Sequence, residues 1–171
     1  MGQIKPGWEG RFFEDFEVGD VYRCRYGRTV TEADNIQFTL LTNNTNQIHY
    51  NRDYGARTPW GQCLVNSALT LAIIAGMGVM DVSENGFNLG WDEITLPNPV
   101  FVSDTLYSES EVLEKRESKS RSEQGIVKVE TRGYKQDASL VIRYRRSVMV
   151  WKRANAPSIA LFPPVHESSS P

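Results

Sequence analysis

The feature that most constrains the fold is an uninterrupted apolar run near the middle of the chain, ALTLAIIAGMGVM. It predicts a helix over 67–79 with large apolar side chains on every side and alanines between them. Such a helix must be buried in protein, because the run is shorter than the roughly 20 residues that span a bilayer. The rest of the chain therefore has to supply a layer that wraps this helix.

Several segments have the alternation or the β-branched composition of strands, and polar, turn-like links separate the later ones. The expected strands cover residues 21–30, 87–96, 105–115, 126–135 and 140–152. Short polar links suit antiparallel hairpins. We therefore expect an α+β fold, a single domain over 1–153 in which a five-stranded antiparallel sheet wraps around the central buried helix.

Three further local features follow from the sequence. Thr31 and Asp34 have the spacing of a capping box, which predicts a helix that begins after Thr31. In the last strand we expect Arg143, Arg145 and Arg146 to form a solvated face. The segment 154–171 is rich in proline and serine, so we expect a tail outside the domain.

Composition excludes several classes of function. The 171-residue chain has a net charge of −2 and a pI near 5.7, whereas nucleic-acid binding generally needs a basic surface. The N-terminal stretch lacks the apolar core of a signal peptide. Cys24 and Cys63 lack metal-ligand spacing. We therefore expect a cytoplasmic protein with no metal and with no nucleic-acid or membrane partner.

The candidate functional stretch lies directly before the apolar run, over 42–67. It is rich in Asn, Gly and Arg, and it contains His49, one of two histidines in the chain. The first turn of the following helix offers free backbone N–H groups and a positive dipole end. A neutral histidine can accept a proton from water near neutral pH. Chemistry is therefore expected where this stretch meets the helix.

Three motifs, in order, resemble those of the MaoC-like, R-specific enoyl-CoA hydratases. That family has roughly G-D-x-N-P-[LIV]-H, then F-G-x-x-I-A-H-G at the central helix, and later R-P-V-x-x-G-D-T-L. This chain has NNTNQIH over 43–49, WGQCLVNS over 60–67 and NPVFVSDTL over 98–106. The resemblance covers about 13–150 and is greatest to the mesaconyl-CoA and itaconyl-CoA hydratases. It implies a single hot-dog domain, a homodimer or higher, and a CoA-thioester substrate.

The resemblance also implies the catalytic groups. His49 matches the histidine that acts on water, and the backbone N–H of Ser67 matches the donor to the thioester oxygen. Such a donor stabilises the enolate-like charge that develops as water adds to the double bond. Asn44 falls where the family has its catalytic Asp. Coenzyme A is part of the substrate, so no separate cofactor is expected.

An amide at position 44 cannot act as an acid or a base. Three explanations remain open. Asn44 and His49 position one water and His49 handles both protons; or Asp34 or Asp53 substitutes for the missing acid; or the protein only binds acyl-CoA. We favour the first, because a neutral Asn44 avoids the repulsion between a catalytic Asp and a substrate carboxylate.

A dicarboxylic substrate also needs cationic and polar partners. The candidates are three nearby arginines and three motif residues, namely Arg28, Arg52, Arg57, Asn46, Trp60 and Gly61. The favoured reaction is addition of water to the double bond of a branched dicarboxylic enoyl-CoA such as mesaconyl-CoA or itaconyl-CoA, or its reverse. A hot-dog acyl-CoA thioesterase and a non-catalytic acyl-CoA-binding homologue are the alternatives.

Overall fold

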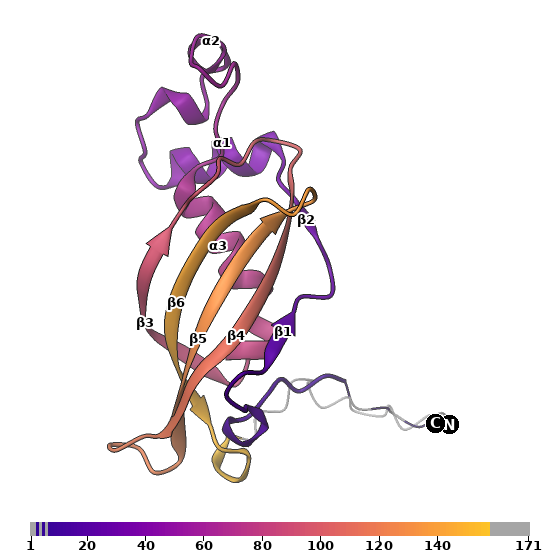
Figure 1. Cartoon of the computed structure of the whole chain (residues 1–171), viewed down its shortest axis with the longest axis vertical. Helices are drawn as coiled ribbons and strands as arrows, with labels where there is room; N and C mark the ends of the chain where they lie inside the picture. Colours follow the sequence, from indigo (N-terminus) through magenta and orange to yellow (C-terminus); the bar gives the residue numbers. More distant parts are fainter. Residues whose placement is uncertain (1–2, 4, 6, 158–171) are drawn as a thin grey trace, which may run out of the picture.

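The computed structural model describes residues 3, 5 and 7–157, so most of the expected tail lies outside the described residues. A curved antiparallel sheet wraps around one long helix, α3 (Figure 1). The strand order is β1-β4-β5-β6-β3, with β2 also paired to β4. The strands are β1 Val21–Arg23, β2 Arg28–Thr29, β3 Gly86–Thr95, β4 Thr105–Glu117, β5 Gln124–Lys135 and β6 Leu140–Trp151. The α+β layout is therefore as predicted.

The prediction of five strands was wrong by one, because the expected strand over 21–30 is split. Its two parts, β1 and β2, both pair with β4. A Cβ atom at Gly27, between them, would come within 2.7 Å of the Tyr107 ring on β4. The ring of Tyr107 packs against this glycine at the point where the ladder is interrupted.

The helices are α1 Glu32–Leu41, α2 Arg52–Ala56 and α3 Ser67–Met77, with short 3₁₀ turns η1 Phe13–Asp15, η2 Gln47–His49 and η4 Arg153–Asn155. The predicted capping box of α1 is confirmed, because Thr31 Oγ1 accepts from the Asp34 N–H and an Asp34 carboxylate oxygen accepts from the Thr31 N–H. One element was not predicted. A π-helical turn, η3 Val79–Ser83, follows α3 and carries the chain into β3.

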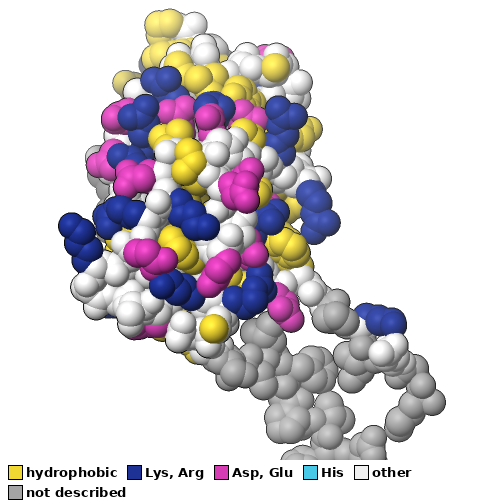
Figure 2. Space-filling view, turned by 60° about the horizontal axis from the view of Figure 1, so that its bottom comes forward, with side chains coloured by type: hydrophobic (Ala, Val, Ile, Leu, Met, Phe, Trp, Pro, Cys, Tyr) yellow, Lys and Arg dark blue, Asp and Glu magenta, His cyan; other side chains and the backbone are white. Residues whose placement is uncertain are grey.

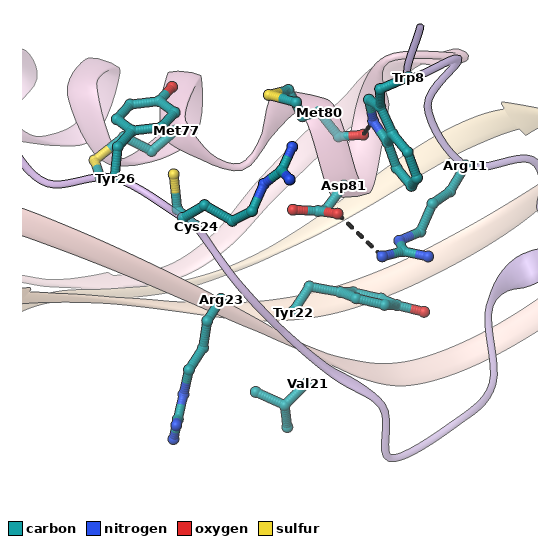
Figure 3. A pocket seen from close by; sticks show the side chains of 11 residues that line it. Trp8, Arg11, Val21, Tyr22, Arg23, Cys24, Tyr26, Met77, Met80 and Asp81 are labelled. Atoms are coloured by element: carbon teal, nitrogen blue, oxygen red, sulfur yellow. Dashed lines mark hydrogen bonds and ion pairs between the residues drawn. The ribbon is translucent and has the colours of Figure 1, made fainter. Parts of the chain in front are cut away.

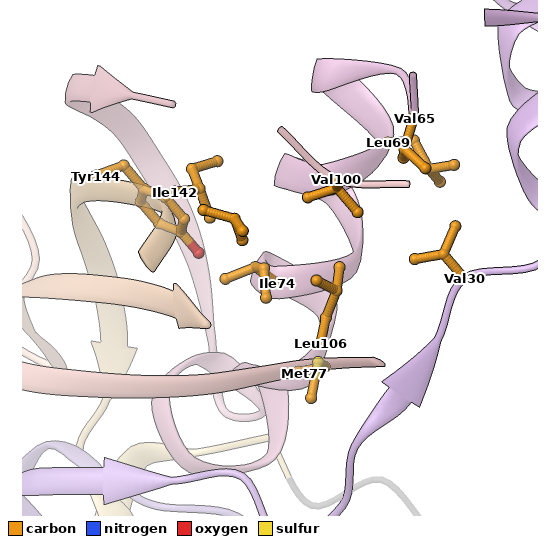
Figure 4. Packing of buried hydrophobic residues seen from close by; sticks show 10 residues of the cluster. Val30, Val65, Leu69, Ile74, Met77, Val100, Leu106, Ile142 and Tyr144 are labelled. Atoms are coloured by element: carbon orange, nitrogen blue, oxygen red, sulfur yellow. The ribbon is translucent and has the colours of Figure 1, made fainter. Parts of the chain in front are cut away.

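The core consists of two apolar clusters inside the curved sheet. The first surrounds α3, where Ile74 packs with side chains such as Leu106 and Ile142 (Figure 4). The second lies under η1 and η3 and contains Phe16 and Val127. Burial of α3 is achieved only on its sheet-facing side, since its other side, with Ala68, Ala72 and Gly76, is exposed.

The edge strand β3 is unusually apolar. Its region exposes five large apolar side chains, each 43–48% accessible: Phe87, Leu89, Trp91, Ile94 and Leu96. Exposed edge strands pair readily with other strands. The chain therefore leaves apolar side chains uncovered on β3 and on one side of α3.

The outer face of the sheet is charged with both signs interspersed. Arg132 on β5 bonds to Glu109, Glu111 and Glu130. Figure 2, which views the molecule from nearer its lower end, shows Lys, Arg, Asp and Glu side chains mixed over the surface. No helix among the described residues is long and apolar enough to cross a bilayer.

The expected solvated arginine face on β6 is wrong at one position. Arg143 is exposed, but Arg146 is only 1% accessible. Successive strand side chains point to opposite faces, so Arg146 shares the inward face with Tyr144 and Val148, which are two residues away on either side. Its guanidinium therefore lies inside the curved sheet, near Gly78 at the C-terminal end of α3.

Candidate active site

A cavity of about 250 Å³ opens at the N-terminal end of α3. Its lining includes His49, Trp60 and Ser67 of the predicted site residues, together with Thr70 and the segment 96–100 that follows β3. The polar loop, the start of α3 and the exit of β3 thus meet at one place. Among the described residues, no charged Lys, Arg, Asp or Glu side chain contributes to this lining.

His49 is held in a defined orientation at the end of η2. Its Nδ1 lies 3.0 Å from the backbone carbonyl oxygen of Leu64. A carbonyl oxygen only accepts hydrogen bonds, so this contact favours the tautomer with the proton on Nδ1. The lone pair is then on Nε2, which makes the imidazole a proton acceptor for a molecule in the cavity.

Ser67 is the first residue of α3, and its neighbour Asn66 is the N-cap. The Asn66 side-chain oxygen accepts from the Ala68 N–H at 2.9 Å. Ser67 therefore presents an N–H of the first helical turn, for which the helix itself has no carbonyl acceptor. With the positive end of the helix dipole behind it, this N–H can stabilise negative charge on an oxygen in the cavity.

Asn44 and Asn46 shape the loop that carries His49, and both lie outside the cavity lining. Asn44 Oδ1 accepts from the Asn46 N–H at 3.0 Å, and Asn46 Oδ1 accepts from the Ile48 N–H at 3.3 Å. These local bonds are typical of Asn in turns and caps. Gly61, which has a positive φ of 67°, also lies outside the lining. Their proposed roles in water or substrate binding stay predictions.

The three candidate arginines also lie outside the cavity, and each is paired with an acid. Their partners are Asp34 for Arg28, Glu32 for Arg52 and Asp53 for Arg57. The two acids considered as substitutes for the missing Asp are thus in ion pairs. Burial raises the pKa of Asp34, but its bonds to Thr31 and Arg28 outweigh this effect and lower the pKa overall. A carboxyl group of that kind is a poor proton donor at neutral pH.

The sequence analysis missed Asn35, which lies on α1 and is 1% accessible. Its side chain bonds to backbone groups of His49, Leu64 and Asn66, and so joins the loop to the start of α3. The available signal was its position one turn before Thr39, since both polar residues fall on the buried face of α1. No three His, Cys, Asp or Glu side chains in the described part of the chain are grouped as a metal site.

A larger cavity, of about 410 Å³, lies near the opposite end of α3, between β1 and η3 (Figure 3). Arg11 there pairs with Asp81 at 3.1 Å and stacks on the ring of Tyr22 at 4.3 Å. Burial and the hydrogen bond to Asp20 raise the pKa of Tyr22 to about 12. This cavity has neither a histidine nor a helix N-terminus in its described lining, so the smaller cavity at His49 is the candidate active site.

A family model described as mesaconyl-CoA hydratase matches residues 4–159. The chain belongs to this family. Its relatives include beta-methylmalyl-CoA dehydratase of Chloroflexus aurantiacus, 34% identical over 163 residues, and mesaconyl-CoA hydratase of Cereibacter sphaeroides, 32% identical over 148 residues. These matches cover 87% and 86% of this chain but 43% of each relative. The chain thus spans less than half the length of the curated relatives it matches.

Similar solved structures confirm that this chain has the hot-dog fold. A MaoC-like dehydratase from Rhodospirillum rubrum is 26% identical with a TM-score of 0.75, covering 84% of this chain and 99% of that one. A double-hotdog protein from Mycobacterium tuberculosis, 19% identical, aligns with a TM-score of 0.77 over 90% of this chain and 48% of its own. The second match is evidence for the fold alone.

Proposed function

We propose that this chain forms a hydratase site that adds water across the double bond of an enoyl-CoA thioester, or removes it in the reverse direction. One observation carries the proposal. His49, with Nδ1 held by the Leu64 carbonyl, shares a small cavity with the first-turn N–H of Ser67. A base for water and a donor for the thioester oxygen are the two groups that this reaction needs.

The proposed chemistry uses these groups in turn. His49 Nε2 accepts a proton from water as its oxygen bonds to the β-carbon, and the double-bond electrons move toward the thioester carbonyl. The Ser67 N–H stabilises the resulting enolate-like oxygen. The imidazolium of His49 then returns its proton to the α-carbon on the same face. One water is consumed, and His49 ends in its starting protonation state.

The proposed substrate class is a branched dicarboxylic acyl-CoA such as mesaconyl-CoA or itaconyl-CoA. Support comes from the names of the relatives and from the small cavity, which suits a short acyl group with the CoA portion outside it. Because the three candidate arginines lie outside the lining, a carboxylate in the cavity would take its cation from a second chain. No cofactor beyond the CoA of the substrate is part of the proposal.

The proposed assembly is a homodimer or higher oligomer in the cytoplasm. The apolar edge strand β3 and the bare face of α3 supply a surface that a second copy would cover. Analytical ultracentrifugation should show self-association at micromolar concentration. A stable monomer under those conditions would contradict this part of the proposal.

The test of the activity is a panel of enoyl-CoA and hydroxyacyl-CoA thioesters followed by mass spectrometry for gain or loss of water, with a free-thiol assay in parallel. Water exchange without thiol release supports the hydratase, and thiol release supports the alternative hot-dog thioesterase. Binding without either reaction supports a non-catalytic acyl-CoA-binding homologue. Faster turnover of crotonyl-CoA than of mesaconyl-CoA or itaconyl-CoA would overturn the dicarboxylic substrate class.

A further inference from the structure

One buried amide joins the two halves of the candidate site. Asn35 Nδ2 donates to the His49 carbonyl at 2.7 Å and to the Leu64 carbonyl at 3.0 Å. Asn35 Oδ1 accepts from the backbone N–H of Asn66 at 2.8 Å. Both amide hydrogens and the amide oxygen are thus bonded, at 1% accessibility. A single side chain fixes the backbone that carries His49 relative to the cap of α3.

The Leu64 carbonyl is the point where this network reaches the imidazole. The Leu64 carbonyl oxygen accepts a hydrogen bond from Asn35 Nδ2 and lies within hydrogen-bond distance of His49 Nδ1, both at 3.0 Å. Asn35 therefore holds in place the acceptor that selects the Nδ1–H tautomer of His49. Without Asn35, the Leu64 and His49 carbonyls and the Asn66 N–H would all lose a buried partner.

The same face of α1 holds the helix cap through a second contact. Asn66 Nδ2 donates to Thr39 Oγ1 at 3.2 Å, and Thr39, one turn after Asn35, is fully buried. The Thr39 carbonyl also accepts from the Asn44 N–H at 3.0 Å. The loop and the start of α3 are thus both anchored on α1, and Asn35 is the anchor with bonds to both.

We propose that Asn35 is a positioning residue that sets the tautomer of His49 and its placement relative to the Ser67 N–H. This inference rests on the proposed function, since it assigns Asn35 a role in the same site. Asn35 acts through the backbone and not by contact with the substrate. A purely structural residue of equal burial would affect stability and leave the imidazole unchanged.

The first test is the tautomer, read by ¹⁵N NMR of the two histidines in the full chain, with a His166→Gln variant to assign them. Wild type should show the Nδ1–H form of His49, and Asn35→Ala should shift it toward the Nε2–H form that free imidazole prefers. The matched control is Thr131→Val, which removes a buried hydroxyl bonded to Ser110 at 2.8 Å, away from the site. It should leave the His49 tautomer unchanged.

The second test is kinetic, at saturating CoA ester. Asn35→Ala should lower kcat on the order of 10–100-fold, as expected for a misplaced base, with KM changed less than about twofold. Thr131→Val should leave both within about twofold. Asn35→Asp keeps the shape and the acceptor for Asn66 but removes the amide donors. It should therefore show the tautomer shift and kcat loss of Asn35→Ala, and a folded Asn35→Asp protein with wild-type tautomer and kcat would overturn the proposal.

Failure of both Asn35 variants to fold, with Thr131→Val folded, would also overturn it in favour of a structural role. The tautomer does not depend on turnover, so the two proposals fail separately. An inactive wild type with the expected tautomers would count against the hydratase and not against Asn35.

Discussion

Buried polar side chains surround both ends of α3, but the hydrogen bonding of these side chains differs between the two ends. At the N-terminal end, Asn35 and Asn66 are each at most 4% accessible, and their side-chain donors and acceptors are paired. At the C-terminal end, Nε and an NH₂ group of Arg146 have no hydrogen-bond partner among the described residues. Burial lowers the pKa of Arg146, since the interior disfavours its charge.

The difference shows that burial of a polar group does not by itself mark a functional site. Paired groups at the N-terminal end fix a backbone geometry, because each bond is costly to leave unmade. Unpaired groups at the C-terminal end destabilise the folded state. An NH₂ group of Arg146 and the Ser110 hydroxyl both lie close to Gly78, and Ser110 shares a hydrogen bond with Thr131. The precise geometry that catalysis needs is therefore expected at the N-terminal end only.

The largest expected effect is on turnover and separates the two ends directly. His49→Ala should lower kcat for the active CoA ester by about 10²–10⁴-fold, the range for loss of a general base, with CoA-ester affinity largely retained. Arg146→Met, at the other end, should leave kcat within about twofold. Steady-state kinetics and calorimetric binding measure both. Equal losses of kcat in His49→Ala and Arg146→Met would show that the two ends of α3 act as one unit.

The next effect is on stability at the C-terminal end. Arg146→Met replaces an unpaired buried charge by an apolar side chain of similar length, and should raise the free energy of unfolding by about 1–4 kcal/mol. Urea unfolding measures it. The control is Arg143→Met on the exposed face of the same strand, with an expected change within about 0.5 kcal/mol. A loss above about 2 kcal/mol in Arg146→Met would show that the guanidinium is bonded, for example to carbonyls at the end of α3.

A smaller effect concerns α1, on which the paired end is built. Asp34→Asn removes the carboxylate of the capping box and should cost about 1 kcal/mol at neutral pH. Because the folded-state pKa of Asp34 is lowered, this contribution is present above the pKa of the unfolded chain and is lost as pH falls through the folded-state pKa. The gap in unfolding free energy between wild type and variant should therefore narrow in acid.

The control for this pH dependence is Asp53→Asn. Asp53 is 78% accessible and bonds to Arg57 at the surface, where an ion pair contributes little. The unfolding free energies of wild type and Asp53→Asn should therefore be almost equal at every pH. A gap for Asp34→Asn that is constant with pH would contradict the capping role of the carboxylate.

Much of this contrast was predictable at one end and not at the other. His49 and the first turn of α3 could be singled out from residue type, local order and the motif resemblance, and the structure places both at one cavity, where their roles stay predictions. Asn35 was missed because its partners are backbone groups 14 and 29 residues away in sequence. Arg146 was misplaced because a cluster of three arginines suggests a solvated face. Strand alternation instead places the adjacent Arg145 and Arg146 on opposite faces of the sheet. Contacts between distant backbone segments leave little local pattern, here a pair of polar residues, Asn35 and Thr39, one turn apart on α1.

The smallest effects are expected at two glycines near the C-terminal end of α3, Gly76 and Gly78, which are two residues apart. A Cβ at Gly76 meets nothing within 4 Å, so Gly76→Ala should stabilise the protein by about 0.5–1 kcal/mol through helix propensity. A Cβ at Gly78 would lie 3.2 Å from an NH₂ group of Arg146, so Gly78→Ala should gain less or lose stability. In the Arg146→Met background, Gly76→Ala and Gly78→Ala should change the free energy of unfolding by similar amounts. A persistent difference there would place the strain of this end in the backbone of Gly78 and not in the buried guanidinium.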